Sequence, residues 1–334
     1  MPQAGHDGQG PRLARKLRFW RVLGVLALAG LALAALGSAG AFEGLTQRGR
    51  DHIARVRVAG MITSDRSMID LLAGLGRKDS VRAVILDIST PGGTTAGGEA
   101  IYEAVRALGA VKPVVASVDT LAASAGYMIA CGADRIVARR SSIVGSIGVL
   151  FQYGDVSALL DRLGVKVDAI KSSPLKAEPS PFKPASEESK AMLGRVVADS
   201  YDWFVSLVAE RRKLEPQKAR ALADGSIFTG AQGLANGLVD ELGDETAAQK
   251  WLEKEKSVPA GLPILEWKPA RKPGFIPLLS AAPALLRLFG IEAGEREAAE
   301  LANLLERRAF VDGLLSLMQT GTTSQVQGSG NGAK

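Results

Sequence analysis

The residues best placed to do chemistry surround Ser124. This serine lies in the segment LAASAGYMIACGADRIV, residues 121–137, where small side chains crowd around it and a helix is expected to begin. Backbone N–H groups and the dipole at a helix N-terminus stabilise developing negative charge, and small neighbours let a substrate backbone approach closely. Taken alone, the segment fits a helix-capping serine better than a nucleophile.

A second group of special residues is Thr90-Pro91-Gly92-Gly93, which follows a buried apolar run and precedes a helical pattern. Paired glycines free the backbone to point N–H groups at a ligand oxygen, as an oxyanion hole requires. When the motif is considered by itself, a tight turn between a strand and a helix is the better explanation.

Other nucleophiles and bases are scarce. The chain has two histidines, and because His6 lies in the N-terminal tail, His52 is the only candidate for histidine-dependent chemistry. Sites that need two or three histidines, including most zinc hydrolase sites, are therefore excluded, and no metal is expected. The single cysteine, Cys131, is expected to be a small buried apolar residue. A serine nucleophile here would need another base, and a lysine can serve when desolvation lowers its pKa.

Composition indicates a globular protein. Of 334 residues, 46% are hydrophobic and 23% are charged, which leaves room for one large domain or two smaller ones. The formal net charge is +6, and residues 1–21 hold five basic residues against one acid, so the rest of the chain carries only +2. A nearly neutral body offers no basic stripe for nucleic acid.

The basic end is followed by a segment that predicts a membrane anchor. Residues 22–42 contain no charged side chain, and 21 residues of helix span about 31 Å, enough to cross a hydrocarbon core. A cleaved signal peptide is the alternative, with Ala39-Gly40-Ala41 as its cleavage site, but such apolar regions are shorter. Basic residues at 1–21 predict a cytoplasmic tail and a body on the far side, although Arg48, Arg50, Arg55 and Arg57 weaken this orientation signal.

The body shows an α/β pattern. Strands are expected at 53–62, 81–88, 113–118, 135–138 and 147–151, with helices at 98–108 and 122–130 between them. Such alternation indicates a largely parallel sheet covered by helices. Residues 171–184 contain four prolines and are expected to form a loop. A helix at 187–212, strands near Ile227 and Leu238, and a helix near 244–256 complete a domain over 53–267.

The last part of the chain is expected to extend that domain. Residues 268–319 include an apolar stretch at 275–289 and an amphipathic helix at 291–318, whereas residues 320–334 are poor in apolar side chains and are expected to be disordered.

Several motifs in one order resemble a known family. The Pro-Gly-Gly motif is followed about thirty residues later by Ala122-Ala123-Ser124 with Gly126-Tyr127, and then by Gly145-Ser146-Ile147-Gly148-Val149. Further matches are ADGSIFTG at 223–230 and GLVD at 237–240. Their order and spacing resemble the signal peptide peptidase A family, and the resemblance covers roughly residues 53–245.

The resemblance implies an α/β fold shared with Clp proteases and crotonases, built from repeated β-β-α units, and a serine–lysine dyad without a cofactor. By position, the family's nucleophile corresponds to Ser124 and its general base to Lys176, with Lys171 as the nearest competitor. Backbone N–H groups of Gly92, Gly93 and Ala125 would form the oxyanion hole. Ala125 stands where the family usually has glycine, which narrows the space beside the nucleophile.

The lysine would need apolar surroundings to lose its proton. Nearby residues able to supply them are Pro174, Leu175, Pro179 and Phe182. An isolated lysine is more often a solvated surface charge, so the assignment of Lys176 depends on its position in the family's pattern.

The function implied by the resemblance is that of a membrane-anchored serine endopeptidase, which degrades cleaved signal peptides and other apolar or unfolded peptides. Its location would be the bacterial inner membrane, with the catalytic body on the periplasmic side. Short members of this type are expected to form homo-oligomeric rings in which one subunit's serine meets a neighbour's lysine.

Three alternatives remain at this point. Another membrane-bound Clp-fold serine protease with a different protein substrate would share the same dyad. A crotonase-type acyl-CoA enzyme would share the fold, but such enzymes are usually soluble and need no serine–lysine pair. An inactive scaffold would need neither Ser124 nor Lys176, and both are present.

Overall fold

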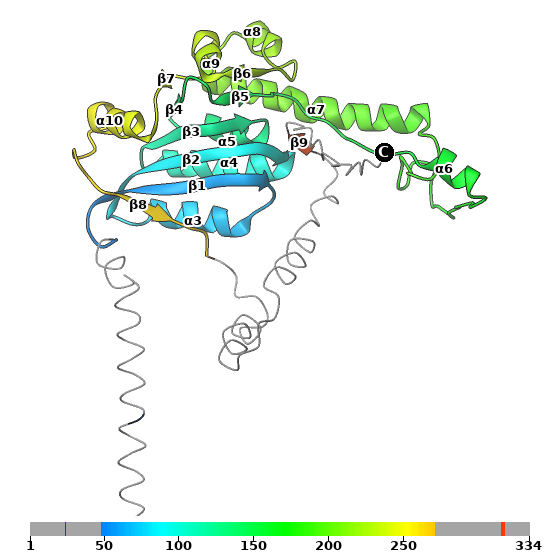
Figure 1. Ribbon diagram of the computed structural model, residues 1–334, viewed down its shortest axis with the longest axis horizontal. Coiled ribbons are helices and arrows are strands. Elements are labelled where there is room, and N and C mark those ends of the chain that lie inside the picture. Colours follow the sequence, from blue (N-terminus) through cyan, green and yellow to red (C-terminus); the bar gives the residue numbers. More distant parts are fainter. Residues whose placement is uncertain (1–23, 25–47, 271–314, 318–334) are drawn as a thin grey trace, which may run out of the picture. The chain divides into compact units, whose positions relative to one another are not determined.

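The computed structural model describes residues 24, 48–270 and 315–317 (Figure 1). The first described elements are β1 (His52–Ile62), α3 (Arg66–Gly76), β2 (Val81–Thr94), α4 (Thr95–Gly109), β3 (Val114–Ala123), α5 (Ala125–Cys131), β4 (Arg135–Ala138) and β5 (Ile143–Gly145). They are followed by α6 (Ser157–Arg162), α7 (Glu187–Arg212), α8 (Pro216–Ala221), β6 (Ile227–Thr229), α9 (Gly230–Asn236), β7 (Glu241–Leu242), α10 (Glu245–Glu255), β8 (Ile264–Trp267) and β9 (Leu315–Leu317).

Two predicted regions lie largely or wholly outside this described part. Of the predicted anchor at 22–42 only Gly24 is described, and of the predicted extension at 268–319 only residues 268–270 and 315–317 are; the tail at 320–334 lies wholly outside. Among the described residues, no helix combines the length and the apolar character that a membrane crossing requires.

The described strands form one sheet in which β6, β5, β3, β2, β1 and β8 are successive neighbours. The pairs β2–β3, β3–β4, β3–β5 and β1–β8 are parallel, whereas β5–β6 is antiparallel. A mainly parallel sheet connected by helices confirms the predicted α/β class.

The two central strands each behave as two consecutive segments. The register of β2 against β3 shifts between Ile88 and Thr90. Strand β3 pairs with β4 through its first half and with β5 through Leu121–Ala123. Two strand segments therefore precede each of the helices α4 and α5. This arrangement corresponds to the β-β-α units expected from the resemblance.

Alternate side chains of the strands contribute to two cores. Ala54 and Val56 of β1, together with Leu86 of β2, face a large cluster that includes α3, α4, α5 and the second half of α7. The intervening residues, such as Ile53 and Ile85, pack against α10 on the opposite face. Because successive strand residues point to opposite faces, both faces of the parallel sheet are covered.

Some element boundaries differ from the prediction because tertiary contacts override local signals. Residues 90–93 were expected to form a loop, but β2 stays extended to Thr94. Strand β3 likewise continues to Ala123, so the helix expected from residue 122 begins at Ala125. Buried small residues such as Ala122 and Ala123 fit a strand in a crowded core as well as they fit a helix.

Three further predictions of elements are wrong. The expected strand at 147–151 is replaced by β5 at 143–145, because Gly145 and Ser146 adopt positive φ values of 96° and 50° and turn the chain. Leu238 lies in a buried turn, where its carbonyl accepts a bond from Tyr127. Residues 315–317, placed in an amphipathic helix by their pattern, form strand β9.

Among the described residues, helix α7 packs on the body mainly through its C-terminal half. Its buried apolar side chains lie in the second half, from Phe204 to Val208. At its C-terminal end Arg211 donates to the carbonyls of Cys131 and Ala133, and Arg212 pairs with Asp240 at 2.6 Å. Residues 151–186, which we call the arm, contain α6 and lead into the other end of α7 (Figure 1).

Candidate active site

Ser124 occupies a sharp turn between β3 and α5. Its backbone has φ 56° and ψ −118°, a conformation that costs energy for any residue other than glycine. The turn is held because the Ser124 N–H donates to the Gly145 carbonyl at 2.8 Å, and its own carbonyl accepts from Met128 N–H at 2.9 Å. Ser124 makes no side-chain capping bond, so the helix-cap explanation of this serine is not supported. Strained strand-to-helix turns of this kind present nucleophilic serines in other hydrolases.

The helix after Ser124 is too short to contribute a large dipole. Helix α5 has seven residues, Ala125–Cys131, and all of them are buried. The first N–H groups of any helix have no partner inside that helix. Ala125 N–H therefore remains a predicted oxyanion donor through a local hydrogen bond, whereas the dipole argument made from the sequence carries less weight.

Small residues bring the end of β2 against the start of α5. A Cβ atom placed on Gly126 would lie 2.5 Å from the Thr90 side chain, and one on Gly98 of α4 would lie 2.9 Å from the Ala125 Cβ. Real Cβ atoms do not approach that closely, so glycine is required at both positions. The predicted oxyanion segment and the predicted nucleophile are thus neighbours in the structure.

The two glycines of β2 differ in their hydrogen bonding. Thr90 Oγ1 donates to the Gly60 carbonyl at 2.5 Å and accepts from Gly92 N–H at 3.1 Å. This bond occupies the Gly92 N–H within the chain, which counts against its predicted role as an oxyanion donor. At Gly93 a Cβ would lie 1.9 Å from the Ile62 carbonyl oxygen, so only glycine lets β2 pass β1 here. Gly93 and Ala125 stay the predicted donors.

Two more motifs of the resemblance meet beside Ser124. Strands β5 and β6 pair antiparallel, with Gly145 opposite Ile227. Ser146 N–H donates to the Ser226 carbonyl at 2.8 Å, and the Cα of Gly145 faces the ring of Phe228. The segments at 145–149 and 223–230 therefore support the turn that holds the serine.

The two candidate lysines of the arm differ in their interactions. Glu178, whose side chain is 3% exposed, pairs with Lys171 at 2.5 Å and with Lys183 at 2.7 Å. The hydrogen bond from Lys171, reinforced by that from Lys183, lowers the pKa of Glu178 to about 2. Lys171 is thereby engaged in an ion pair with a buried carboxylate. In the described part of the chain the Lys176 ammonium has no ion pair or hydrogen bond, which favours Lys176 over Lys171 as a base.

The described residues of the chain do not provide the apolar surroundings expected for Lys176. Lys176 is exposed, whereas Ser124 is only 1% exposed, and Phe182 is itself 47% exposed. The physical reason is that this segment folds around the Glu178 carboxylate and its two ammonium partners instead of around Lys176. The predicted apolar pocket around the base is therefore not present in the described part of the chain.

Neither of the other candidate groups can serve Ser124. His52 lies at the start of β1, while the Thr90–Gly60 bond shows that the far end of β1 adjoins the end of β2 near the serine. Cys131 is 1% exposed, and burial raises the pKa of its thiol to about 11. It stays protonated at neutral pH and is not a nucleophile.

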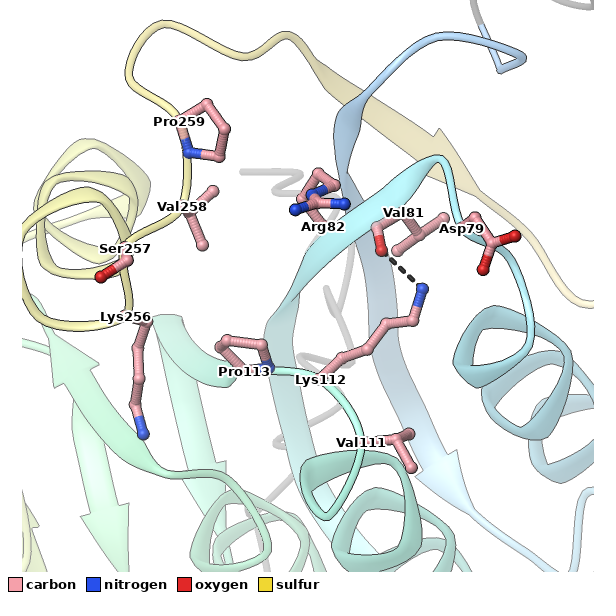
Figure 2. A pocket seen from close by; sticks show the side chains of 10 residues that line it. All are labelled: Asp79, Val81, Arg82, Val111, Lys112, Pro113, Lys256, Ser257, Val258 and Pro259. Carbon is pink, nitrogen blue, oxygen red and sulfur yellow. Dashed lines mark hydrogen bonds between the residues drawn. The ribbon is translucent and has the colours of Figure 1, made fainter.

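A hollow of about 470 Å³ lies at the N-terminal ends of the central strands, whereas Ser124 follows the C-terminal end of β3. It is lined by the starts of β2 and β3, and Figure 2 shows Lys112 donating to the Val81 carbonyl at 2.6 Å. Arg82 and Lys256 also line it. This hollow contains neither the serine nor the lysine of the predicted dyad, so it is not part of the candidate active site.

Comparisons with known proteins agree with this geometry. The sequence profile of peptidase family S49 matches residues 106–259, and that of Clp protease matches residues 54–146. A protein of Methanocaldococcus jannaschii named as a protease is 40% identical over 193 residues, which cover 58% of this chain and 62% of that protein.

Two bacterial relatives give the same picture. A protein of Synechocystis named as a protease is 38% identical over 204 residues, covering 60% of this chain and 73% of that protein. A protein of Enterococcus faecium named as a signal peptide peptidase SppA is 35% identical over 196 residues, covering 57% of this chain and 55% of that protein. The profile matches at 106–259 and 54–146 both include Ser124, together with β3 and α5 on either side of it.

Proposed function

Because the chain belongs to peptidase family S49 as a serine-type peptidase of the signal peptide peptidase A kind, we propose that it cleaves peptide bonds with Ser124 as nucleophile and Lys176 as general base. The observation that carries this proposal is the strained turn at Ser124, φ 56°, held between the glycine-rich end of β2 and the start of α5. A hydroxyl presented in this way needs only a base to become a nucleophile. The peptidase profile also weighs against the acyl-CoA alternative.

Extended peptides fit the end of β2. Residues 315–317 of the chain itself pair antiparallel with Gly92–Thr94. This pairing supports the proposal that the segment beside the serine accepts an extended peptide, which is how strand-binding sites recognise peptides. We propose that apolar or unfolded segments, including remnants of signal peptides, are the substrates. Ala125 beside the nucleophile favours small side chains in the substrate.

Exposed apolar side chains support assembly into a ring. Of thirteen large hydrophobic residues that are exposed in the described part of the chain, eight lie in the arm: Tyr153, Val156, Leu159, Leu163, Val165, Val167, Ile170 and Phe182. Such a concentration marks an interaction surface. Helix α7 adds only Val196 to this set, so the arm, more than the 187–212 helix named from the sequence, would be the surface buried between subunits.

The same arm carries Lys176, and this links assembly to catalysis. We propose that a neighbouring subunit's arm brings Lys176 to Ser124, and that contact with the neighbour desolvates the lysine. This arrangement would supply the apolar surroundings that the isolated chain lacks. It would also enclose the serines and restrict access to extended peptides.

The lysine assignment predicts a sharp difference between two neighbouring residues. Lys176→Ala and Lys176→Arg should each lower kcat/KM on a quenched apolar peptide by about 10³-fold, because a general base is lost and arginine stays protonated. Lys171→Ala should keep measurable activity, since Glu178 still pairs with Lys183. Activity that survives in Lys176→Ala and disappears in Lys171→Ala would show that the other lysine is the base.

The proposed location is the bacterial inner membrane, with residues 22–42 as a single-pass anchor and the catalytic body on the periplasmic side. Protease added to spheroplasts should then digest the body, because it would be accessible from outside. The measurement is loss of the body on an immunoblot, with a cytoplasmic protein as a control for lysis. Protection of the body until the cells are lysed would place it in the cytoplasm and refute the topology.

A further inference from the structure

Thr95 presents a buried hydroxyl for which the fold supplies no partner. It is the first residue of α4, directly after the end of β2, and it is 7% exposed. Among the described residues its Oγ1 is the only buried side-chain polar atom without a hydrogen bond. The adjacent Thr94 differs, because its Oγ1 accepts from Gly97 N–H at 3.1 Å and caps the helix. A buried hydroxyl without a partner destabilises the folded state, and a bound molecule that accepts its hydrogen bond would remove that cost.

The position of Thr95 indicates what that partner is. Thr95 and Gly98 lie one turn apart and therefore share a face of α4. A Cβ on Gly98 would lie 2.9 Å from the Ala125 Cβ and 3.1 Å from the Met128 sulfur. The face that carries Thr95 thus packs on the start of α5, next to Ser124, and Figure 1 shows these two helices side by side under β2 and β3.

The direction of the side chain points to the same place. Helix side chains lean toward the N-terminus of their helix, which for Thr95 is the end of β2. There Gly92–Thr94 pairs antiparallel with residues 315–317. An extended backbone bound beside these residues presents carbonyl oxygens along its length, so a carbonyl is the natural acceptor for a hydroxyl at this position.

We infer that the Thr95 hydroxyl is a substrate-contacting group, which donates a hydrogen bond to a backbone carbonyl of a peptide bound beside Gly92–Thr94. This inference deepens the proposed peptidase function and rests on it. The bond forms with bound peptide in both the ground state and the transition state. The contact therefore contributes to affinity for peptides and leaves the chemical step unchanged.

The test is Thr95→Val, which replaces the hydroxyl with a methyl group of similar shape. KM for a quenched apolar peptide should rise about five- to tenfold, the usual worth of one neutral hydrogen bond, while kcat stays within about twofold. The melting temperature should stay the same or rise, because a desolvated hydroxyl has been removed. Thr95→Ser, which keeps the hydroxyl, should retain the KM of the wild type.

Two further measurements make the result decisive. Thr246→Val, on α10 at the opposite face of the sheet, removes a hydroxyl from a position remote from Ser124 and should leave KM unchanged. Kd for the same peptide, measured in Ser124→Ala with and without Thr95→Val, tests the contact even if Ser124 is not the nucleophile. An unchanged KM and Kd would overturn the inference, as would a lower melting temperature with wild-type KM, which would assign the hydroxyl an internal role. If Thr95→Val does not fold, Thr95→Ala is compared in the same assays.

Discussion

Ser124→Ala should lower kcat for peptide hydrolysis by about 10⁴-fold or more, since loss of a catalytic serine removes the covalent route entirely. The folded state should survive, because alanine fits a site lined by small residues. The hydrogen bonds described above that hold the turn are made by backbone atoms, which alanine keeps. The wild-type protein should also react with a serine-directed phosphonate and gain the mass of the adduct, whereas Ser124→Ala should not.

A matched control is Ser206→Ala, which removes an exposed hydroxyl that bonds the Asp202 carbonyl on α7. It should hydrolyse peptides and bind the phosphonate like the wild type. The same assay can compare peptides with small apolar residues at the cleavage site with peptides that have lysine or glutamate there. Full activity in Ser124→Ala would refute the nucleophile, and a strong preference for charged residues would refute the proposed substrate class.

Mixing two inactive proteins should restore activity if the dyad is shared between subunits. Ser124→Ala protein retains Lys176, and Lys176→Ala protein retains Ser124, so a contact between unlike subunits of a ring can contain both groups. In a randomly mixed ring with one type of head-to-tail contact, about a quarter of the contacts are complete. Specific activity should therefore rise from near zero to about a quarter of the wild-type value.

The physical reason for this expectation is the difference in exposure between the two residues. Ser124 is buried beside the sheet, whereas Lys176 lies exposed in an arm that carries most of the exposed apolar side chains of the described chain. Mass spectrometry of the mixture should show rings that contain both variants. If such rings form and the mixture stays inactive, serine and lysine belong to the same chain and the shared dyad is refuted.

Family motifs and hydrophobic periodicity predicted most of the sheet. The strands at 53–62 and 81–88 and the helix at 187–212 depend on local alternation and on buried apolar runs, which survive folding. The extension of β2 through Gly92 and Gly93 did not follow from the sequence. Proline and glycine ordinarily mark turns, but here β2 continues through them to Thr94 while Thr90 bonds Gly60 and Gly92.

The sequence could predict which residues form the candidate site, but not the contacts that surround them in the folded protein. The position of Ser124 follows from its motif, whereas its positive φ depends on the bond from its N–H to Gly145, a contact between separate strands. The partners of Lys171 likewise depend on Glu178, seven residues away in a segment without periodicity. Burial of a carboxylate between two ammonium groups is a property of the folded arm that no local pattern encodes.

Helix α7 sets a rule for how the length of this protein can change. Its 26 residues form a rod of about 39 Å that is fastened at Arg211 and Arg212 and carries the arm at its other end. One inserted residue in the free half would swing the arm about 100° around the rod, because a helix has 3.6 residues per turn. Insertions of about seven or eleven residues restore the direction and change only the reach. The length of this helix can therefore change only by whole turns if the arm is to keep its direction. The diameter of any assembly built through the arm would then vary only in steps.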